Sequence, residues 1–271
     1  MDAYLVSNNG LGDNLFMNGS LNFIKQFYKN VYFLCKVKYY ENVKLFFDKN
    51  SNIICLPFDE TDEYNEIYKI ISNKYNDLNN DIFIAGIHKK YLKSRITNRE
   101  FLNTKLINKI YKIDYSTLNS NNYNFIETFY KDIKLNLTYF FEYFDLPSND
   151  ISKKLYNQVS NYYLVFIQYK SSDNKNLNIS NLKNKYINDD NVLLISNDIN
   201  LYSSDSKKYH LAQKFVLEKV AFYIDLIKNC DEIYLIDSCF TGIVLPLLKT
   251  NRLKAEIVDI IHRDQINKYI I

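Results

Sequence analysis

Two short polar segments of this sequence combine residue types that could handle a proton and a phosphate. The first, Gly10-Leu11-Gly12-Asp13-Asn14, follows an apolar run and holds two of the five glycines in the chain. A strand, a tight glycine turn and a helix start would bring backbone N–H groups and a carboxylate together, which favours anions and offers a general base. The second, Asp237-Ser238-Cys239-Phe240-Thr241-Gly242, follows another apolar run, and its hydroxyls could bind phosphate oxygens.

Asp13 has two interpretations. An acid near a helix N-terminus stays ionised and can take a proton, whereas a capping residue only closes the helix start. A dinucleotide-binding fingerprint would need a third glycine at position 15 and an acid at the end of the second strand, but the chain has Leu15 and Lys36 there. Nicotinamide and flavin binding are therefore not expected.

The elements that must position these segments alternate between strands and helices. Apolar runs and amphipathic patterns predict, in the first part, strands at 3–7, 31–36, 53–56 and 81–85 and helices at 15–28, 41–47 and 65–75. A helix-rich stretch at 100–143 and a turn-like segment at 144–150 follow. The alternation then restarts with strands at 163–168, 192–196, 232–236 and 255–259 and helices at 217–227 and 242–248. This pattern predicts an α/β fold with two domains, residues 1–150 and 151–271, in which ligands gather beyond the carboxyl ends of parallel strands.

The composition is that of a packed globular protein with balanced charge. Of 271 residues 47% are apolar, and 34 basic against 31 acidic residues give a net charge of +3, which does not favour nucleic acid as a partner. No apolar run of 18 residues and no secretory signal pattern is present, so we expect a cytoplasmic protein without a transmembrane segment. The four cysteines are widely spaced and no metal-ligand spacing occurs, so neither a disulfide scaffold nor a metal is expected.

One polar segment lies in each expected domain, and in this order along the chain the two segments resemble those of the family 9 glycosyltransferases. These are heptosyltransferase-like enzymes with the GT-B fold. In that family a G-x-G-D-x-h element opens the acceptor domain, as residues 10–15 do here, and a helix and a strand lead to an acid-Ser/Thr turn in the donor domain, as residues 217–248 do. The resemblance covers roughly the first 30 residues and residues 163–250. It implies two Rossmann-like domains that face each other across a cleft, with residues 1–150 on the acceptor side and residues 151–271 binding a nucleotide sugar. The last helix would pack back on the first domain.

The resemblance also implies roles for single residues. Asp13 would be the general base that deprotonates the acceptor hydroxyl, and the residues expected beside it on the acceptor side are Gly12, Asn14 and His88. The residues expected to bind the donor are Lys170, His210, Asp237, Ser238, Thr241 and Gly242. Two of these have an alternative, since His88 could be part of a solvated loop and His210 could be an ordinary surface histidine. No cofactor is expected, because the nucleotide-diphosphate sugar is itself a substrate.

The expected function is therefore transfer of a hexosyl or pentosyl group from a nucleotide-diphosphate sugar to a glycan or other hydroxyl acceptor, without a metal. A base opposite the leaving group implies a single displacement and hence inversion. The family's donor turn usually carries a Gly after the Ser/Thr and a His further on, whereas this chain has Cys239 and then Gly242. That departure motivates an alternative, a GT-B-like module that binds nucleotide or glycan without catalysis. A third hypothesis is a phosphate-handling enzyme of ordinary Rossmann type that uses the Gly10 loop alone.

Overall fold

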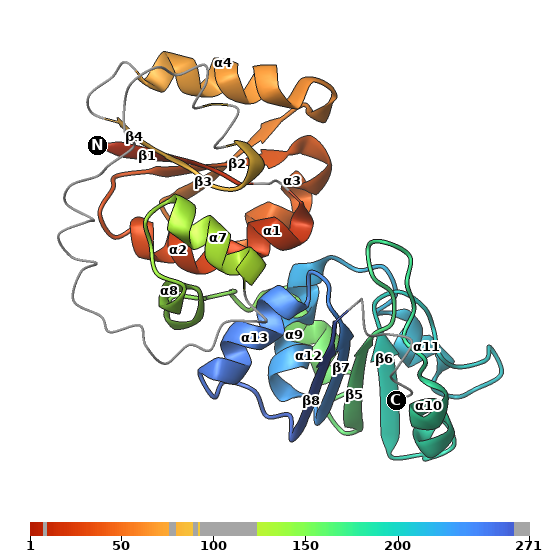
Figure 1. Cartoon of the computed structure of the whole chain (residues 1–271). Coiled ribbons are helices and arrows are strands. Elements are labelled where there is room, and N and C mark those ends of the chain that lie inside the picture. The colour runs from red at the N-terminus through yellow and green to blue at the C-terminus, as the bar shows by residue number, and fades with distance from the viewer. Residues whose placement is uncertain (8–9, 76–79, 89–91, 93–123, 263–271) are drawn as a thin grey trace. The chain divides into compact units, whose positions relative to one another are not determined.

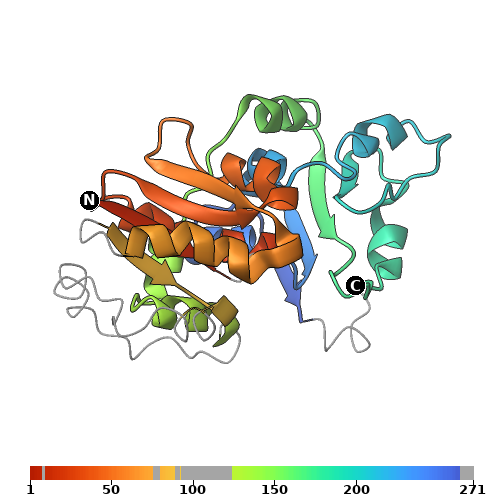
Figure 2. The same ribbon diagram turned by 90° about the horizontal axis from the view of Figure 1, so that it is seen from above.

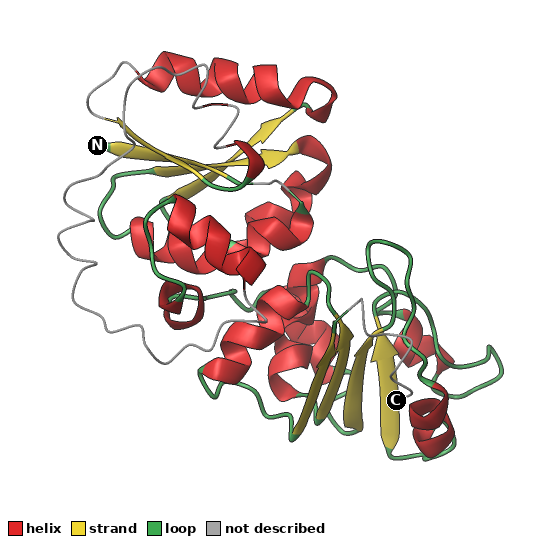
Figure 3. Cartoon of the chain, in the orientation of Figure 1, coloured by secondary structure: helices red, strands yellow, loops and turns green. Residues whose placement is uncertain are grey.

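The computed structural model describes residues 1–7, 10–75, 80–88, 92 and 124–262. The chain divides into two compact units, residues 1–145 and 146–271, close to the boundary expected at residue 150. Each unit holds a four-stranded parallel sheet with helices around it, so the predicted α/β fold is confirmed (Figures 1 and 3). Residues 93–123 of the helix-rich stretch and the terminal segment 263–271, where the last helix is expected, lie outside the described residues.

The first unit is built on a sheet with the strand order β3-β2-β1-β4. Its strands are β1 (Asp2–Val6), β2 (Val31–Lys36), β3 (Ile53–Phe58) and β4 (Asn80–Ile84). Its helices are α1 (Leu11–Phe16), α2 (Asn18–Ile24), α3 (Val37–Val43), α4 (Glu63–Tyr75), α7 (Asn124–Asp132) and α8 (Thr138–Glu142), with short 3-10 helices η1 (Lys44–Phe46) and η2 (Glu60–Asp62). Because every pairing is parallel, the carboxyl ends of the four strands lie at one edge of the sheet. In Figure 1, α4 covers one face of this sheet, and α1, α2 and α7 lie on the other.

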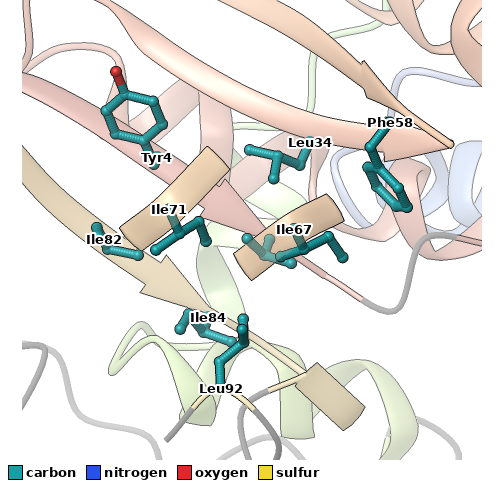
Figure 4. Packing of buried hydrophobic residues seen from close by; sticks show 9 residues of the cluster. Tyr4, Leu34, Phe58, Ile67, Ile71, Ile82, Ile84 and Leu92 are labelled. Carbon is teal, nitrogen blue, oxygen red and sulfur yellow. The ribbon is translucent and has the colours of Figure 1, made fainter. Parts of the chain in front are cut away.

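A cluster of buried apolar side chains holds α4 on its face of the sheet. Ile67 and Ile71, one helical turn apart on α4, pack over strand residues that include Tyr4 and Ile82 (Figure 4). Figure 2, seen from above, shows α4 lying across the strands. Full burial of one such side chain stabilises the fold by about 1.5–3 kcal/mol. The cluster therefore determines where the first residue of α4, Glu63, meets the sheet.

The second unit repeats this plan with the strand order β6-β5-β7-β8. Its strands are β5 (Tyr163–Gln168), β6 (Val192–Ser196), β7 (Glu232–Ile236) and β8 (Ile257–Ile261). Its helices are α9 (Asp150–Asn157), α10 (Ser180–Tyr186), α11 (Tyr209–Gln213), α12 (Ile224–Asn229) and α13 (Thr241–Lys249), with a 3-10 helix η3 (Val220–Tyr223). In Figure 1, α9, α12 and α13 lie on one side of this sheet, and α10 and α11 pack against β6. No helix within the described ranges combines the length and the apolar character needed to cross a bilayer.

Three of the four strands of the second unit lie at their expected positions, whereas the strand expected at 255–259 lies two residues later, at 257–261. The predicted ranges of β5, β6 and β7 are confirmed, because these strands are buried on both faces and read as continuous apolar runs. The helix expected at 217–227 is wrong in its first turn. Leu217 has a φ of 61° and Lys219 is extended, so helical structure begins only at Val220.

The single helix expected at 15–28 is also wrong, because the chain forms α1 and α2 with a break at Met17. The Tyr130 hydroxyl occupies this break: it donates to the Phe16 carbonyl at 2.8 Å and accepts from the Ser20 N–H at 3.1 Å. In a continuous helix that N–H and that carbonyl would bond each other directly. A side chain from α7 is thus inserted into the backbone ladder, which is an established cause of a helix kink.

Tyr130→Phe should destabilise the first unit by about 1–2 kcal/mol, because the substitution keeps the ring but removes the partner of two buried backbone groups. Urea unfolding of the two proteins would measure the difference, with hydrogen exchange in residues 11–24 showing where it acts. An unchanged midpoint would mean that α1 and α2 close into one helix without the hydroxyl.

Candidate functional site

Each strand of the first sheet brings one titratable side chain to the carboxyl edge. Asp13 lies on α1 after β1, Lys36 is the last residue of β2, Glu63 begins α4 after β3, and His88 follows β4. These four residues are far apart in sequence, and the parallel arrangement of the strands gathers them. The edge is therefore a charged site built by the sheet.

Asp13 lies in the first turn of α1 and reaches back to the turn before it. Its carboxylate accepts the Gly10 N–H at 3.1 Å, so Asp13 does close the helix start, although from the third helical position and not as the N-cap itself. Burial raises the pKa of the Asp13 carboxyl, while the Gly10 N–H and the positive charge of Lys36 oppose that rise. A raised pKa makes the carboxylate a stronger base, so capping and proton transfer are compatible roles for this side chain.

The turn around Asp13 explains two further residues of the first motif. A Cβ on Gly10 would lie 2.8 Å from Asp13 Oδ2, so a side chain there would displace the carboxylate. Asn14 is fully buried, and its Nδ2 donates to the Gly10 carbonyl at 2.8 Å. Gly12 is half-buried within α1. The Asn14 side chain therefore supports the turn that carries Asp13, and its expected place beside an acceptor stays a prediction.

Lys36, Glu63 and His88 form a connected chain of contacts at the same edge. Lys36 Nζ lies 2.7 Å from Glu63 Oε2, and His88 Nε2 lies 2.9 Å from Glu63 Oε1. The His88 side chain is fully buried, so the alternative of a solvated loop residue is wrong. The expected place of His88 on the acceptor side stays a prediction. Burial lowers the pKa of the His88 imidazole, Glu63 opposes this and Lys36 adds to it, which favours a neutral ring that donates to Glu63.

In the second unit, a half-buried carboxylate holds the loop that carries Lys170. Asp198, after β6, accepts the Lys170 N–H at 2.9 Å and Gln168 Nε2 at 3.0 Å. Gln168 also donates to the Lys170 carbonyl at 2.8 Å, while the residue Lys170 itself is exposed. Burial raises the pKa of the Asp198 carboxyl, and the donors from the β5 loop oppose that rise. The backbone of Lys170 is therefore anchored, and its exposed side chain can reach a ligand.

The turn after β7 is closed by its own hydrogen bonds. Thr241 Oγ1 accepts the Ser238 N–H at 3.1 Å, and Ser238 Oγ accepts the Phe240 N–H at 3.3 Å. The N–H groups of Thr241 and Gly242 bond the carbonyls of Ser238 and Cys239. Most of the N–H groups that were expected to grip a phosphate are thus engaged within the turn, and a bound phosphate would have to compete for them or use the Ser238 hydroxyl.

Of the remaining residues expected to bind the donor, Asp237 and Gly242 lie near the carboxyl end of β7, and His210 lies on the surface. Asp237 directly follows β7, and its carboxylate lies 3.9 Å from His262 Nε2. Gly242 is buried in the first turn of α13. His210 is exposed on α11, where its ring packs against Tyr209, and within the described ranges no hydrogen bond or ion pair ties it to the β7 turn. The structure therefore brings Lys170, Asp237 and the turn to one edge but leaves His210 as a surface residue.

The surroundings of the cysteine in this turn disfavour its thiolate. Burial and the negative charge of Asp198 raise the pKa of the Cys239 thiol to about 12, so the reactive thiolate is scarce. All four cysteines are free thiols. Among the described residues, no three His, Cys, Asp or Glu side chains are arranged to hold a metal ion.

Three residues at the two edges were not predicted from the sequence: Glu63, Asp198 and Lys36. Each lies at the end of a strand or within a few residues of it, where parallel sheets collect functional groups. Their positions relative to the strands could have singled them out. The contacts that these residues make could not have been predicted from their positions alone, because each contact joins segments that are distant along the chain.

Comparison with solved structures supports the fold expectation. The E. coli ADP-heptose LPS heptosyltransferase II structure aligns over 96% of this chain and 90% of its own, with a TM-score of 0.54 and 9% sequence identity. A glycosyl transferase family 9 structure from Veillonella parvula DSM 2008 aligns over 97% of this chain and 86% of its own, with a TM-score of 0.54 and 8% identity. The predicted heptosyltransferase-like fold is confirmed, and the face-to-face placement of its two units stays a prediction.

Comparison of the sequence alone finds no similar protein. No protein-family model matches the chain, and no curated protein sequence matches it.

Proposed function

We propose that this chain is a glycosyltransferase that moves a hexosyl or pentosyl group from a nucleotide-diphosphate sugar to a hydroxyl of a glycan or similar acceptor, with inversion and without a catalytic metal. The observation that carries the proposal is its fold, which is shared over nearly the whole chain with two proteins described as glycosyltransferases. One of them is described by its use of ADP-heptose. In this proposal, the charged edges of the two units would supply the groups that such a reaction uses.

The chemistry requires a base at the acceptor and positive charge at the leaving group. Asp13, whose pKa burial raises, would take the proton of the acceptor hydroxyl as the new bond to the anomeric carbon forms. The bond from that carbon to the diphosphate breaks with its electron pair, so negative charge grows on the phosphate oxygens. The exposed Lys170 ammonium and the start of α13 would stabilise that charge, and Asp237 would contribute to holding the donor.

Donor binding can be tested without knowing the acceptor. We expect one of ADP, GDP, UDP, dTDP and CMP to raise the melting temperature, because a ligand of the folded state stabilises it by about 2.7 kcal/mol at 100 times its dissociation constant. Lys170→Met should weaken this shift. The matched control is Lys153→Met, which removes an exposed lysine on α9 of the same unit and should leave the shift unchanged.

The proposal fails if no nucleotide stabilises the protein at millimolar concentration. It also fails if the shift is the same in both lysine variants, because the phosphates would then lie away from Lys170. Once a donor base is known, transfer to a panel of glycan acceptors with and without EDTA would test the metal-independent reaction.

The closed turn after β7 favours a second candidate, a module that binds nucleotide or glycan without catalysis. The N–H groups of Ser238 and Phe240 are engaged by side-chain oxygens of the same turn, and Cys239 and Gly242 depart from the family pattern. Nucleotide binding without either transfer or donor hydrolysis would support this candidate over the enzyme.

A further inference from the structure

The segment that follows β5, residues 169–177, is a small hairpin with Lys170 at its base. Lys170 and Asn176 pair as an antiparallel bridge. Beside this bridge the Leu177 N–H donates to the Tyr169 carbonyl at 2.9 Å, and the Leu177 side chain is buried. The place of Lys170 therefore depends on what holds the base of this β5 hairpin.

One oxygen of the Asp198 carboxylate holds that base. Asp198 Oδ2 accepts the Lys170 N–H at 2.9 Å and Gln168 Nε2 at 3.0 Å. Gln168 Nε2 also donates to the Lys170 carbonyl at 2.8 Å, so both main-chain polar groups of Lys170 are bonded. Hydrogen bonds to an ionised acceptor are roughly twice as strong as those between neutral groups. Asp198 therefore fixes the main chain of Lys170, while the Lys170 side chain stays exposed.

The loop that carries Asp198 is itself tied to the core of the second unit. The residue before it, Asn197, accepts the Leu217 N–H on its carbonyl at 2.7 Å and donates from Nδ2 to the Tyr223 hydroxyl at 2.7 Å. Tyr223 is fully buried, and its ring packs against Phe166 of β5. These contacts do not involve the β5 hairpin. The Asp198 carboxylate is thus a fixed point to which the hairpin is attached.

We propose that Asp198 is a positioning residue for donor binding: it keeps the β5 hairpin closed at its base, so that Lys170 is in place before a diphosphate binds. This inference rests on the proposed role of Lys170 at the donor phosphates. A segment that becomes ordered only on binding lowers affinity, because its loss of freedom opposes association. A hairpin held in the ligand-free protein avoids that cost. Asp198 acts through Lys170 and needs no contact with the ligand.

The first test needs no ligand. Asp198→Asn keeps the size of the side chain but removes its charge and replaces one oxygen by an amide that can only donate. Hydrogen exchange in residues 168–177 should become about tenfold faster or more, because a lost hydrogen bond to a charged group removes roughly that much local protection. If Asp198→Asn does not fold, Gln168→Leu removes the side-chain part of the same contact and should change exchange in the same direction.

The second test measures whether Asp198 acts through Lys170. Calorimetric titration with ADP, GDP, UDP and dTDP identifies the nucleotide that the native protein binds most tightly. For that nucleotide, Asp198→Asn should raise the dissociation constant by about two- to tenfold, the scale of ordering costs for one immobilised side chain. Lys170→Met should raise it too. Because the two changes affect one contact, the loss in the double variant should be smaller than the product of the separate losses.

Asp231→Asn is the matched control, because Asp231 holds the other end of β5 in the same way. Its Oδ2 accepts the Leu164 N–H at 2.8 Å, and its Oδ1 pairs with Lys254 at 2.7 Å. This variant should lower the melting temperature but leave nucleotide affinity and the exchange of the β5 hairpin at their native values. A general loss of stability is thereby separated from a loss of position.

The inference is overturned if Asp198→Asn binds nucleotide like the native protein, if exchange in the β5 hairpin is unchanged, or if the losses in Asp198→Asn and Lys170→Met multiply. Equal loss of affinity in Asp231→Asn would also overturn it. The proposed function fails separately, when the native protein binds none of the four nucleotides. The donor role of Asp198 then fails with it, whereas faster exchange in Asp198→Asn would still show that Asp198 holds the hairpin.

Discussion

Asp13→Asn is expected to lower the turnover number for sugar transfer by about 10²–10⁴-fold, the usual contribution of a positioned general base. The amide keeps the size of the carboxylate and can still accept the Gly10 N–H, so the turn should survive. Donor binding should also survive, because the groups expected at the phosphate belong to the other unit. Steady-state kinetics with saturating donor, together with nucleotide-induced thermal shifts, would show a loss of turnover with unchanged binding.

The matched control for Asp13→Asn is Asp48→Asn. Asp48 is an exposed aspartate of the same unit that also accepts a backbone N–H, from Asn50 at 2.7 Å. Its substitution should leave turnover near the native value. Native turnover in Asp13→Asn would remove this carboxylate from the mechanism.

The stability of Asp13→Asn gives an independent check on the environment of the base. The folded-state pKa of Asp13 is raised by burial, so the fold disfavours the ionised form, and stability should increase as pH falls through that pKa. A neutral amide avoids this cost at pH 7. We therefore expect the variant to be at least as stable as the native protein, which is the pattern of a residue kept for activity.

Gly19→Ala is expected to have the largest effect on stability, with a loss of about 3 kcal/mol, at the upper end of the range for overpacking. A Cβ on Gly19 would lie 2.4 Å from the Tyr139 carbonyl oxygen and 2.8 Å from Phe140 Cα. These are backbone atoms of α8, which cannot turn aside as a side chain can. Helix propensity alone would favour alanine by roughly 1 kcal/mol, so a measured loss would identify the close approach of α2 and α8 as its cause.

Urea unfolding and hydrogen exchange would test this expectation. Exchange should rise in residues 18–24 and 138–142, where α2 and α8 pack together. Asn73→Ala is the control, because it places alanine at an exposed position of α4 and should change stability by less than about 0.5 kcal/mol. Equal or greater stability of Gly19→Ala would show that α8 can move away from α2.

Much of the fold and the outline of the site could be predicted from the order of residues. The strands β5, β6 and β7 are buried on both faces, so their apolar runs reveal them directly, and Asp13 and Asp237 stand out because each follows such a run. The break in the first helix could not be predicted. It depends on the Tyr130 hydroxyl, which arrives from a position 114 residues away to bond Phe16.

The alternation of strands and helices follows from local periodicity, so the order of residues is enough to predict which side chains stand at the carboxyl ends of parallel strands. What those side chains contact depends on how distant segments pack together. His88 reads as a loop residue but is a buried donor to Glu63, and the hydroxyl of Thr241 closes its own turn. Pairing of charges, desolvation of Asp13 and the tight contact at Gly19 all arise between segments distant along the chain, so no local pattern encodes them.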